Sequence, residues 1–432
     1  MDKSTIIGTT SEQLPDDWKM VPLGDVFKPI TVRLNEINGS SQPIPILSMT
    51  RAHGLVLQSE KFDKRVASRD TSNYKVVKSG QLVYGFPIDE GVIAILHRYP
   101  IGAVSPAYQV WEPISDVDLT FIDYMLKTPF MINAYKMFSS NVVERRRNLA
   151  QKDFVRIPIA LPPLPEQRAI AHVLSTVRQA IEATENVINA ARELKRSMMK
   201  HLFTYGPVPV DQADQVPLKE TMIGEVPMDW NIMPLGELIR EDIKNGAFIK
   251  RTQFGSGTPL LNVADTYKDL SVDISQLERV MCLPNDLEMY ALHLNDLVFV
   301  RSSLKREGVG HCCIVEIINE PSIFDCHLMR VRVQEDKAIP KFLAYFFISP
   351  IGKNALISRS KTTTMTTINQ SGLASTFAPL PTLSEQEVVS TYLTKIDNKI
   401  YAESQQKTAL EAIFNSLLHH LMAGKVRVRV SS

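Results

Sequence analysis

Four short sequence blocks occur twice in this chain of 432 residues, in the same order each time. They are a Thr-x-Ile-Gly block (5–8 and 221–224), a Pro-x-Asp-Trp-x3-Pro-Leu-Gly block (15–24 and 227–236), a strand-like apolar block (80–84 and 295–299), and a Leu-Pro-x-Leu-x-Glu-Gln block (161–167 and 380–386). A chance match would rarely keep four blocks in one order. The sequence therefore predicts an internal duplication.

Each repeat begins with a segment of mixed character, roughly residues 25–160 and 237–378. Short runs rich in β-branched and aromatic residues alternate there with Gly, Pro and Asn turns, which is typical of strands. Short helical patterns also occur, for example over 342–347. These segments predict two mixed α+β globular domains.

Each repeat ends with the pattern of a long helix. Apolar residues recur at alternating spacings of four and three residues over 170–202 and again over 389–421, with polar residues interrupting the series near its middle. This periodicity predicts a coiled-coil seam. A helix of about 38 residues is roughly 57 Å long, too long to lie within one small domain.

The ends of both helices carry recognisable signals. Pro165 suits a first helical turn, and Ser384 with Glu387 forms a possible capping box. Gly206, followed by Pro207, and Gly424 are typical stop signals.

Two similar helices in one chain can bury both apolar seams by packing antiparallel. We therefore expect an α+β fold in which two mixed domains are joined by two long antiparallel coiled-coil helices, with internal pseudo-twofold symmetry. Such symmetry suits a protein that reads DNA half-sites about 34 Å apart, although a coiled-coil adaptor with two protein-binding heads remains an alternative. The expected segments are a first domain (1–164), a spacer helix (165–206), a linker (207–229), a second domain (230–382), a second spacer helix (383–424) and a tail (425–432).

The net charge is only +1, so overall charge does not identify a nucleic-acid-binding protein. Any DNA-binding surface must be local. The sequence has no apolar run of the roughly 20 residues that span a bilayer, and we expect a cytoplasmic protein. All four cysteines lie in the second half, which favours reduced thiols over a disulfide framework.

The sequence carries no recognisable catalytic motif. The Pro162-Pro163 pair lacks the polar neighbours with which an adenine methyltransferase grips its base, and no Walker-type phosphate loop occurs. The glycine pair at 255–257 is expected to be a surface turn. Five residues are potential zinc ligands, namely His311, Cys312, Cys313, Cys326 and His327. They lack paired Cys-x2-Cys spacing, so we predict no metal site. We also predict that this chain has no catalytic residue.

Taken together, the repeated Ile-Gly, Pro-x-Asp-Trp and Leu-Gly pattern, followed by Leu-Pro-x-Leu-x-Glu-Gln at the start of a long helix, resembles the specificity subunits of type I restriction-modification systems. The resemblance covers nearly the whole chain. It implies a non-catalytic subunit whose two target-recognition domains bind the halves of an asymmetric, bipartite site in double-stranded DNA. The helices would set the spacer and dock two methyltransferase subunits and, through them, restriction and translocase subunits.

The same resemblance implies that S-adenosylmethionine, ATP and Mg2+ are used by the partners and that this chain itself holds no cofactor. Two alternatives stay open. One is the specificity subunit of a related system whose methyltransferase and nuclease are fused, and the other is an adaptor without a DNA role.

Position in the repeat and hydrogen-bonding chemistry indicate the candidate DNA-binding residues. They are Arg145, Arg146, Arg147 and Asn148 in the first domain, and Lys250, Arg251, Arg301, Ser302, Lys305, Arg306, Lys361, Thr362, Thr363 and Thr364 in the second. A solvated surface charge is the alternative for each basic residue. The first-domain loop at 85–90 carries no base and is expected to pack, with Lys64, Arg65, Arg69 and Lys75 as weaker candidates.

The Glu-Gln pairs that begin the two helices are candidates for contact with a protein partner. They are Glu166, Gln167, Glu385 and Gln386. Helix capping is the alternative explanation for them.

Overall fold

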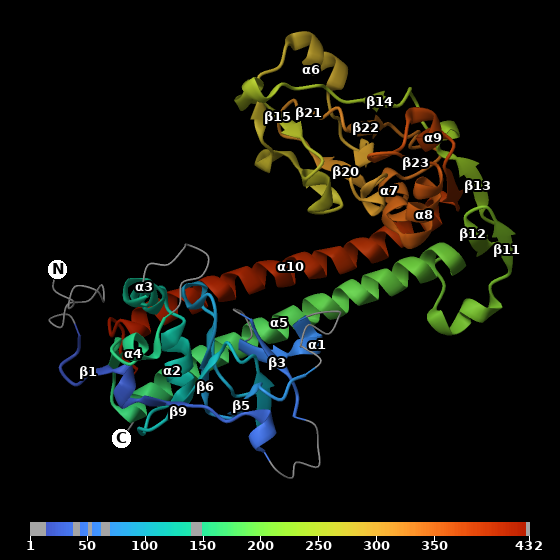
Figure 1. The fold of residues 1–432 in the computed structure, drawn as a ribbon. Coiled ribbons are helices and arrows are strands. Elements are labelled where there is room, and N and C mark those ends of the chain that lie inside the picture. The colour runs from blue at the N-terminus through green and yellow to red at the C-terminus, as the bar shows by residue number, and fades with distance from the viewer. Residues whose placement is uncertain (1–13, 38–43, 51–53, 62–69, 140–148, 429–432) are drawn as a thin grey trace. The chain divides into compact units, whose positions relative to one another are not determined.

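A computed structural model describes residues 14–37, 44–50, 54–61, 70–139 and 149–428 (Figure 1). The chain forms two compact units, Met1–Thr184 with Gln406–Ser432, and Glu185–Gln405. Both long helices contribute residues to both units. Among the described residues, no helix is long and apolar enough to cross a membrane.

The first unit contains a four-stranded antiparallel sheet with the strand order β2-β9-β6-β7. Its strands are β1 (Lys19–Pro22), β2 (Phe27–Ile30), β3 (Leu47–Thr50), β4 (Gly54–Leu57), β5 (Lys75–Lys78), β6 (Leu82–Tyr84), β7 (Ile93–Ile95), β8 (Ile101–Val104), β9 (Gln109–Pro113) and β10 (Pro158–Leu161). Its helices are α1 (Gln58–Lys61), α2 (Leu119–Leu126), α3 (Pro129–Phe138), α4 (Gln151–Phe154) and the first half of α5 (Leu164–Tyr205).

The second unit contains a five-stranded sheet with the order β14-β22-β18-β20-β16. Its strands are β11 (Leu218–Thr221), β12 (Gly224–Pro227), β13 (Asn231–Pro234), β14 (Lys244–Asn245), β15 (Phe254–Leu261), β16 (Ser271–Asp273), β17 (Arg279–Val280), β18 (Leu297–Val300), β19 (Ser302–Ser303), β20 (Cys312–Ile317), β21 (Ile323–Phe324), β22 (Leu328–Val331), β23 (Lys361–Thr362), β24 (Thr366–Thr367) and β25 (Phe377–Leu380). Its helices are α6 (Pro284–Tyr290), α7 (Pro340–Ile348), α8 (Pro350–Ser358), α9 (Gln370–Ala374) and the first half of α10 (Leu383–Met422).

The internal duplication is visible in the strand order. The order β2-β9-β6-β7 in the first unit corresponds to β14-β22-β18-β20 in the second, which adds β16 at one edge. In both units three helices follow the sheet, and the second of them starts with a Pro after a hydroxyl cap, Thr128 or Ser349. The predicted duplication and mixed α+β fold are therefore confirmed.

The turn that enters each central strand has the same geometry in both copies. Gly80 and Asn295 adopt left-handed backbone conformations, with φ of 86° and 67°. The next residue, Gln81 or Asp296, accepts a hydrogen bond from the backbone amide three residues earlier, at 2.8 Å and 2.7 Å. Glycine and asparagine are the residues that adopt this conformation at least cost, which explains their place in the repeated block.

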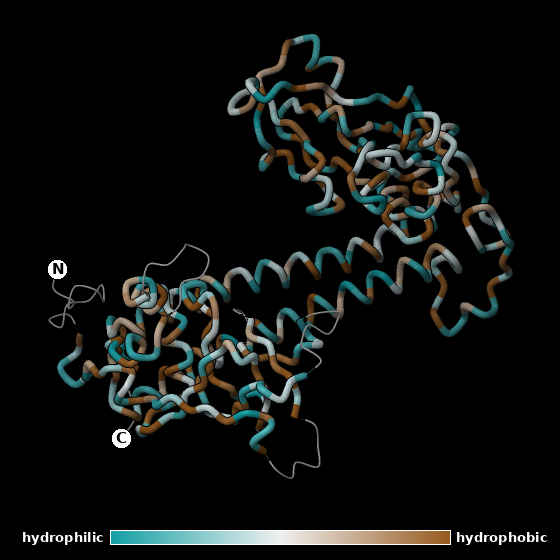
Figure 2. The backbone as a smooth tube through the Cα atoms, in the orientation of Figure 1, coloured by the Kyte–Doolittle hydropathy of each residue, from teal (hydrophilic) through white to brown (hydrophobic). Residues whose placement is uncertain are grey.

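The two long helices pack antiparallel in each unit. In the first unit, α5 residues Ile170, Leu174 and Ile181 share a buried cluster with Phe414 and Leu421, which lie near the end of α10. This places the start of one helix beside the end of the other. Figure 2 shows hydrophobic residues recurring along both helices.

In the second unit the end of α5 packs against the start of α10. Leu202 and Phe203, near the end of α5, share a cluster with Val389 and Leu393, near the start of α10. Closer to the middle of α5, Nζ of Lys195 pairs with an Asp397 carboxylate oxygen at 2.6 Å. The predicted antiparallel seam and its polar interruption are confirmed.

The helix ends match the predictions with one correction. Gly206 and Gly424 adopt φ of 80° and 66°, as expected for residues that end a helix. The capping box of α10 is formed by Thr382 and Glu385, because the Thr382 amide donates to Glu385 Oε2 at 3.1 Å and the Glu385 amide donates to Thr382 Oγ1 at 3.3 Å. The predicted box of Ser384 with Glu387 was displaced by two residues, because α10 begins at Leu383.

The segment expected to be a linker, 207–229, is itself folded. It contains the antiparallel β11–β12 hairpin, with Leu218 opposite Pro227.

Candidate nucleic-acid interface

In each unit the repeated block that contains the tryptophan meets the repeated block that contains the Glu-Gln pair. The indole Nε1 of Trp18 donates a hydrogen bond to Glu166 Oε2 at 3.2 Å, and Nε1 of Trp230 donates to Glu385 Oε1 at 3.3 Å. Beside each pair, the strand after the tryptophan lies antiparallel to the strand before the helix, β1 with β10 and β13 with β25. These contacts attach the first strand of each repeat to the start of the long helix that ends the same repeat.

The glutamine that follows each glutamate has an equally specific position. Oε1 of Gln167 accepts a hydrogen bond from the Asp118 amide at 2.9 Å, and Oε1 of Gln386 accepts one from the Ile339 amide at 2.7 Å. Asp118 and Ile339 are the residues that precede α2 and α7. Each glutamine also donates to a carbonyl five residues earlier, at 2.9 Å. The amide groups thus join the start of the long helix to the start of a domain helix.

These positions correct the prediction that the Glu-Gln pairs contact a partner. The exposed fractions of Glu166, Gln167 and Gln386 are 4%, 3% and 0%. Glu385 is half-buried and forms the capping box. The three buried side chains are hydrogen-bonded inside the chain and do not reach a surface that a second protein could touch.

In the second unit, two segments of the predicted DNA-binding set are brought together. Strand β19 pairs antiparallel with β24, which pairs with β23, so that Ser302 and Lys361 both lie opposite Thr367. The Ile368 amide also donates to the Arg301 carbonyl at 3.0 Å. We call the result the second-domain basic surface; it comprises Arg301, Ser302, Lys305, Arg306, Lys361, Thr362, Thr363 and Thr364.

The side chains of this surface are available to a ligand. Arg301, Lys305, Arg306 and Lys361 are exposed. Among the residues that the structure describes, none of these four forms an ion pair. Unpaired cations on and beside one small sheet create a local positive potential despite the small net charge of the chain.

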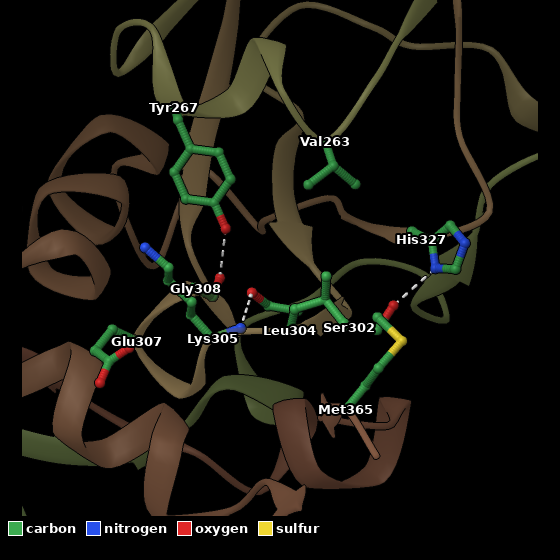
Figure 3. Close-up of a pocket in the computed structure, with 10 residues that line it drawn as sticks. Val263, Tyr267, Ser302, Leu304, Lys305, Glu307, Gly308, His327 and Met365 are labelled. Carbon is green, nitrogen blue, oxygen red and sulfur yellow. Dashed lines mark hydrogen bonds between the residues drawn. The ribbon is translucent and has the colours of Figure 1, made fainter. Parts of the chain in front are cut away.

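A cavity of about 610 Å³ opens beside the basic surface (Figure 3). Its apolar walls come from Val263, Leu304 and Met365. The Ser302 hydroxyl and Nδ1 of His327 are hydrogen-bonded at 2.7 Å on one side of it. The cavity therefore combines apolar surface with hydrogen-bonding groups next to exposed cations.

Tyr267 borders the same cavity and supports the loop that carries Lys305. Its hydroxyl donates to the Gly308 carbonyl at 2.8 Å, and its ring stacks on His311 with centroids 4.5 Å apart. Nε2 of His311 lies 2.9 Å from the Thr266 carbonyl. Burial, with a smaller contribution from Lys353, lowers the pKa of His311 to about 4. A neutral imidazole thus holds the loop.

Sequence reasoning did not select Tyr267, Leu304, His327 or Met365 for this site. Leu304 lies inside the predicted basic loop, but an apolar side chain is not a sequence signal for DNA binding. His327 could have been found from strand pairing, because β22 begins opposite the end of β18, where Leu328 pairs with Val300. Tyr267 and Met365 have no comparable sequence signal.

The predicted pair Lys250 and Arg251 occupies a different part of the second unit. Both residues are exposed, and Arg251 begins a 3-10 turn that leads into β15. Strand β15 belongs to the β17-β15-β21 sheet and not to the sheet of the basic surface. The structure therefore does not assign this pair to the same interface.

The first-domain candidates Arg145, Arg146, Arg147 and Asn148 lie outside the described residues, as do Lys64, Arg65 and Arg69. Lys75 is described, and its Nζ donates to the Tyr108 carbonyl at 2.6 Å. Burial lowers the pKa of Lys75, with a smaller effect from Arg33. Lys75 is thus engaged within the domain. In the loop at 85–90, Ile88 is 1% exposed but Phe86 is 43% exposed, so only part of this loop packs as expected.

The cysteines form no disulfide in the structure. Cys312 and Cys313 are buried, and burial raises the pKa of both thiols. Among the described residues, one group brings potential metal ligands within 4.8 Å of one another, Asp325, Cys326 and His327. Burial and the neighbouring Asp325 also raise the pKa of Cys326, which keeps its thiol protonated.

Comparisons with known proteins agree with this architecture. The family model for the type I restriction modification DNA specificity domain matches twice, at residues 15–192 and 227–412. The chain is 26% identical over 428 residues to the type I restriction enzyme MjaVIII specificity subunit of Methanocaldococcus jannaschii, covering 96% of this chain and 95% of the relative. A putative type I restriction enzyme MjaX specificity subunit of the same organism is 23% identical, with 99% and 97% covered.

The fold is also similar to a solved structure. The crystal structure of the type I restriction-modification system S subunit from M. genitalium matches with a TM-score of 0.59 and 14% identity, covering 95% of this chain and 98% of that one. The two matches to the family model include both Trp-Glu pairs and the second-domain basic surface. The chain therefore belongs to the family of type I restriction-modification DNA specificity subunits, the non-catalytic members of these systems that recognise the DNA sequence.

Proposed function

We propose that this subunit reads an asymmetric, bipartite site in double-stranded DNA, with one half-site bound by each repeat. The observation that carries the proposal is the second-domain basic surface. There the segments that begin at Arg301 and at Lys361, which are 60 residues apart in the sequence, pair within one sheet. Guanidinium groups suit guanine edges, while lysine and threonine side chains suit phosphates. The combination supports sequence reading together with backbone contacts.

The asymmetry of the site is supported by a difference between the two repeats. The loop after β18 carries Arg301, Lys305 and Arg306. The corresponding loop after β6, residues 85–90, carries two acidic residues and no basic residue. Domains with different side chains at the same place in the fold would read different bases. The two half-sites would therefore differ in sequence.

We further propose that an apolar stripe on α5 docks a helix of a methyltransferase subunit. Val187, Ala190 and Leu194 are exposed and lie at spacings of three and four residues, so they share one side of the helix. The exposed fractions of Val187 and Leu194 are 41% and 52%. Exposed apolar side chains at this spacing fit a partner helix in a coiled-coil manner. This stripe replaces the buried Glu-Gln residues as the predicted contact.

The chemistry of the complex would then belong to its other subunits. Methyltransferase subunits would transfer a methyl group from S-adenosylmethionine to adenine, and restriction and translocase subunits would use ATP and Mg2+. Because chromosomal DNA is the proposed substrate, we place the assembly in the cytoplasm.

Co-expression with an adenine methyltransferase subunit of a type I system from the same genome tests this proposal. We expect stable co-purification and adenine methylation at one bipartite sequence. A Leu194→Asp variant should lose the partner, whereas Leu283→Asp, at a leucine of 67% exposure beside α6, should retain it. Methylation without sequence preference would contradict DNA reading, and co-purification of Leu194→Asp would contradict the docking stripe. A single partner carrying both methyltransferase and nuclease sequences would identify the related fused system.

A further inference from the structure

Leu304 is an unusual residue for the tip of a basic loop. Its exposed fraction is 82%, the largest among the exposed large hydrophobic residues of the described chain. It lies directly before Lys305 and Arg306 and after the β19 strand. An apolar side chain held in water at this place gains nothing for the fold of the isolated chain.

The side chain also forms part of the wall of the cavity beside the basic surface. Leu304 lines this cavity together with Met365 and the hydrogen-bonded pair of Ser302 and His327 (Figure 3). Hydrogen-bonding groups and the Lys305 ammonium group surround an apolar centre, and the Glu307 carboxylate also lines the cavity. This arrangement matches the edge of an A·T base pair in the major groove, where hydrogen-bonding atoms lie next to the thymine 5-methyl group.

We infer that Leu304 is a specificity-determining residue that contacts the 5-methyl group of a thymine in the half-site bound by the second domain. This inference rests on the proposed function, because it assumes that the basic surface faces DNA. Lys305 binds a neighbouring phosphate and holds the loop in the groove. Leu304 then distinguishes thymine from cytosine by the favourable burial of its methyl group.

Deoxyuridine lacks this methyl group and keeps the same hydrogen-bonding edge, so it is a direct probe. The test uses the full chain in complex with its methyltransferase partner and a duplex that carries the methylated site found in cells. Each thymine of the second-domain half-site is replaced by deoxyuridine in turn, and the Kd is measured by fluorescence anisotropy at fixed salt. For the wild-type chain we expect one position to weaken binding roughly fourfold, the change for burying about one methyl group.

The variant Leu304→Ala should bind the thymine duplex more weakly and should no longer distinguish deoxyuridine from thymine at that position. Leu283→Ala, which removes another highly exposed leucine of the same domain, is the matched control and should distinguish them as the wild type does. Binding of both variants to the first half-site should be unchanged, which verifies that they are folded.

Two results would overturn the inference while leaving the proposed function intact. One is that no deoxyuridine position affects the wild type. The other is that Leu304→Ala weakens every duplex by the same factor, as loss of an apolar wedge between base steps would do. Failure to find any methylated bipartite site would instead contradict the proposed function itself.

Discussion

Nε1 of Trp18 donates a hydrogen bond to Oε2 of Glu166, 3.2 Å away and 148 residues later in the chain. The same bond joins Trp230 to Glu385, 155 residues apart. Glu166 is additionally paired with Arg427 of the C-terminal segment at 2.6 Å, while Glu385 caps its helix with Thr382. The Trp–Glu bond is therefore present in both units, whereas the second partner of each glutamate differs.

Trp18→Phe removes the indole N–H and keeps an aromatic ring. We expect a loss of about 1–2 kcal/mol in the free energy of unfolding, because Glu166 is buried and accepts the bond as a charged group. Urea denaturation measures the loss. Repeating the substitution in a Glu166→Ala background isolates the bond from the change in ring size. If the tryptophan substitution costs the same in both backgrounds, the bond contributes nothing.

The low pKa of His311 predicts a loss of stability in acid. Its value of about 4 in the fold lies below the ordinary 6.5, so the unfolded chain binds a proton more readily. The contribution of the neutral imidazole is complete above pH 6.5 and is lost as pH falls toward 4, by roughly 1–3 kcal/mol. Urea denaturation between pH 7.5 and 4.5 measures it.

In His311→Gln this part of the pH dependence should disappear. His97→Gln, at an exposed histidine of the first unit, serves as the control and should follow the wild-type curve. Parallel curves for His311→Gln and the wild type would show that another group is responsible.

Two basic residues of the second-domain surface should differ in their effect on DNA binding. Lys361→Ala should weaken specific and non-specific binding alike and reduce the salt dependence by about one phosphate contact. Arg301→Ala should weaken only the second half-site, by about 1–3 kcal/mol, as expected for a base contact. Titrations with cognate and altered duplexes at several salt concentrations measure both effects. Lys244→Ala is the control, because Lys244 lies on β14, outside this surface. The assigned surface would be contradicted if all three variants changed the affinity for DNA and its salt dependence to the same extent.

Lengthening the helices should change the DNA spacer and leave the half-sites unchanged. The Lys195–Asp397 pair sets the antiparallel register of the two helices, from which we expect positions near 188 to lie opposite positions near 404. Matched seven-residue insertions after Ile188 and after Glu403 preserve the seam and add about 10 Å, or about three base pairs. Methylation mapping reads out the new spacer. Changed bases within a half-site would contradict separate reading domains, and an insertion in α5 alone should instead destabilise the chain.

The sequence was sufficient to predict the duplication, the long helices and their antiparallel pairing, because these depend on periodicity and on local signals such as Gly206 and Gly424. The sequence indicated Arg301 and Lys361 as candidates for DNA binding, but it did not show that β24 lies between strand β19, which follows Arg301, and strand β23, which begins at Lys361. The burial of Gln167 and Gln386 could not be read from the sequence, because their partners are backbone amides 47 to 49 residues away. Glutamine is usually exposed, and tertiary contacts reverse that preference here.

Mapping of N6-methyladenine in cells that express the methyltransferase partner, with the wild-type chain or with Arg301→Ala, tests the central claim most directly. The account predicts one asymmetric, bipartite motif with the wild-type chain. It predicts relaxed or lost recognition in one half of that motif with the variant, while the other half and the spacer stay the same. A motif that is contiguous, or one that changes in both halves together, would contradict the assignment of one half-site to each repeat.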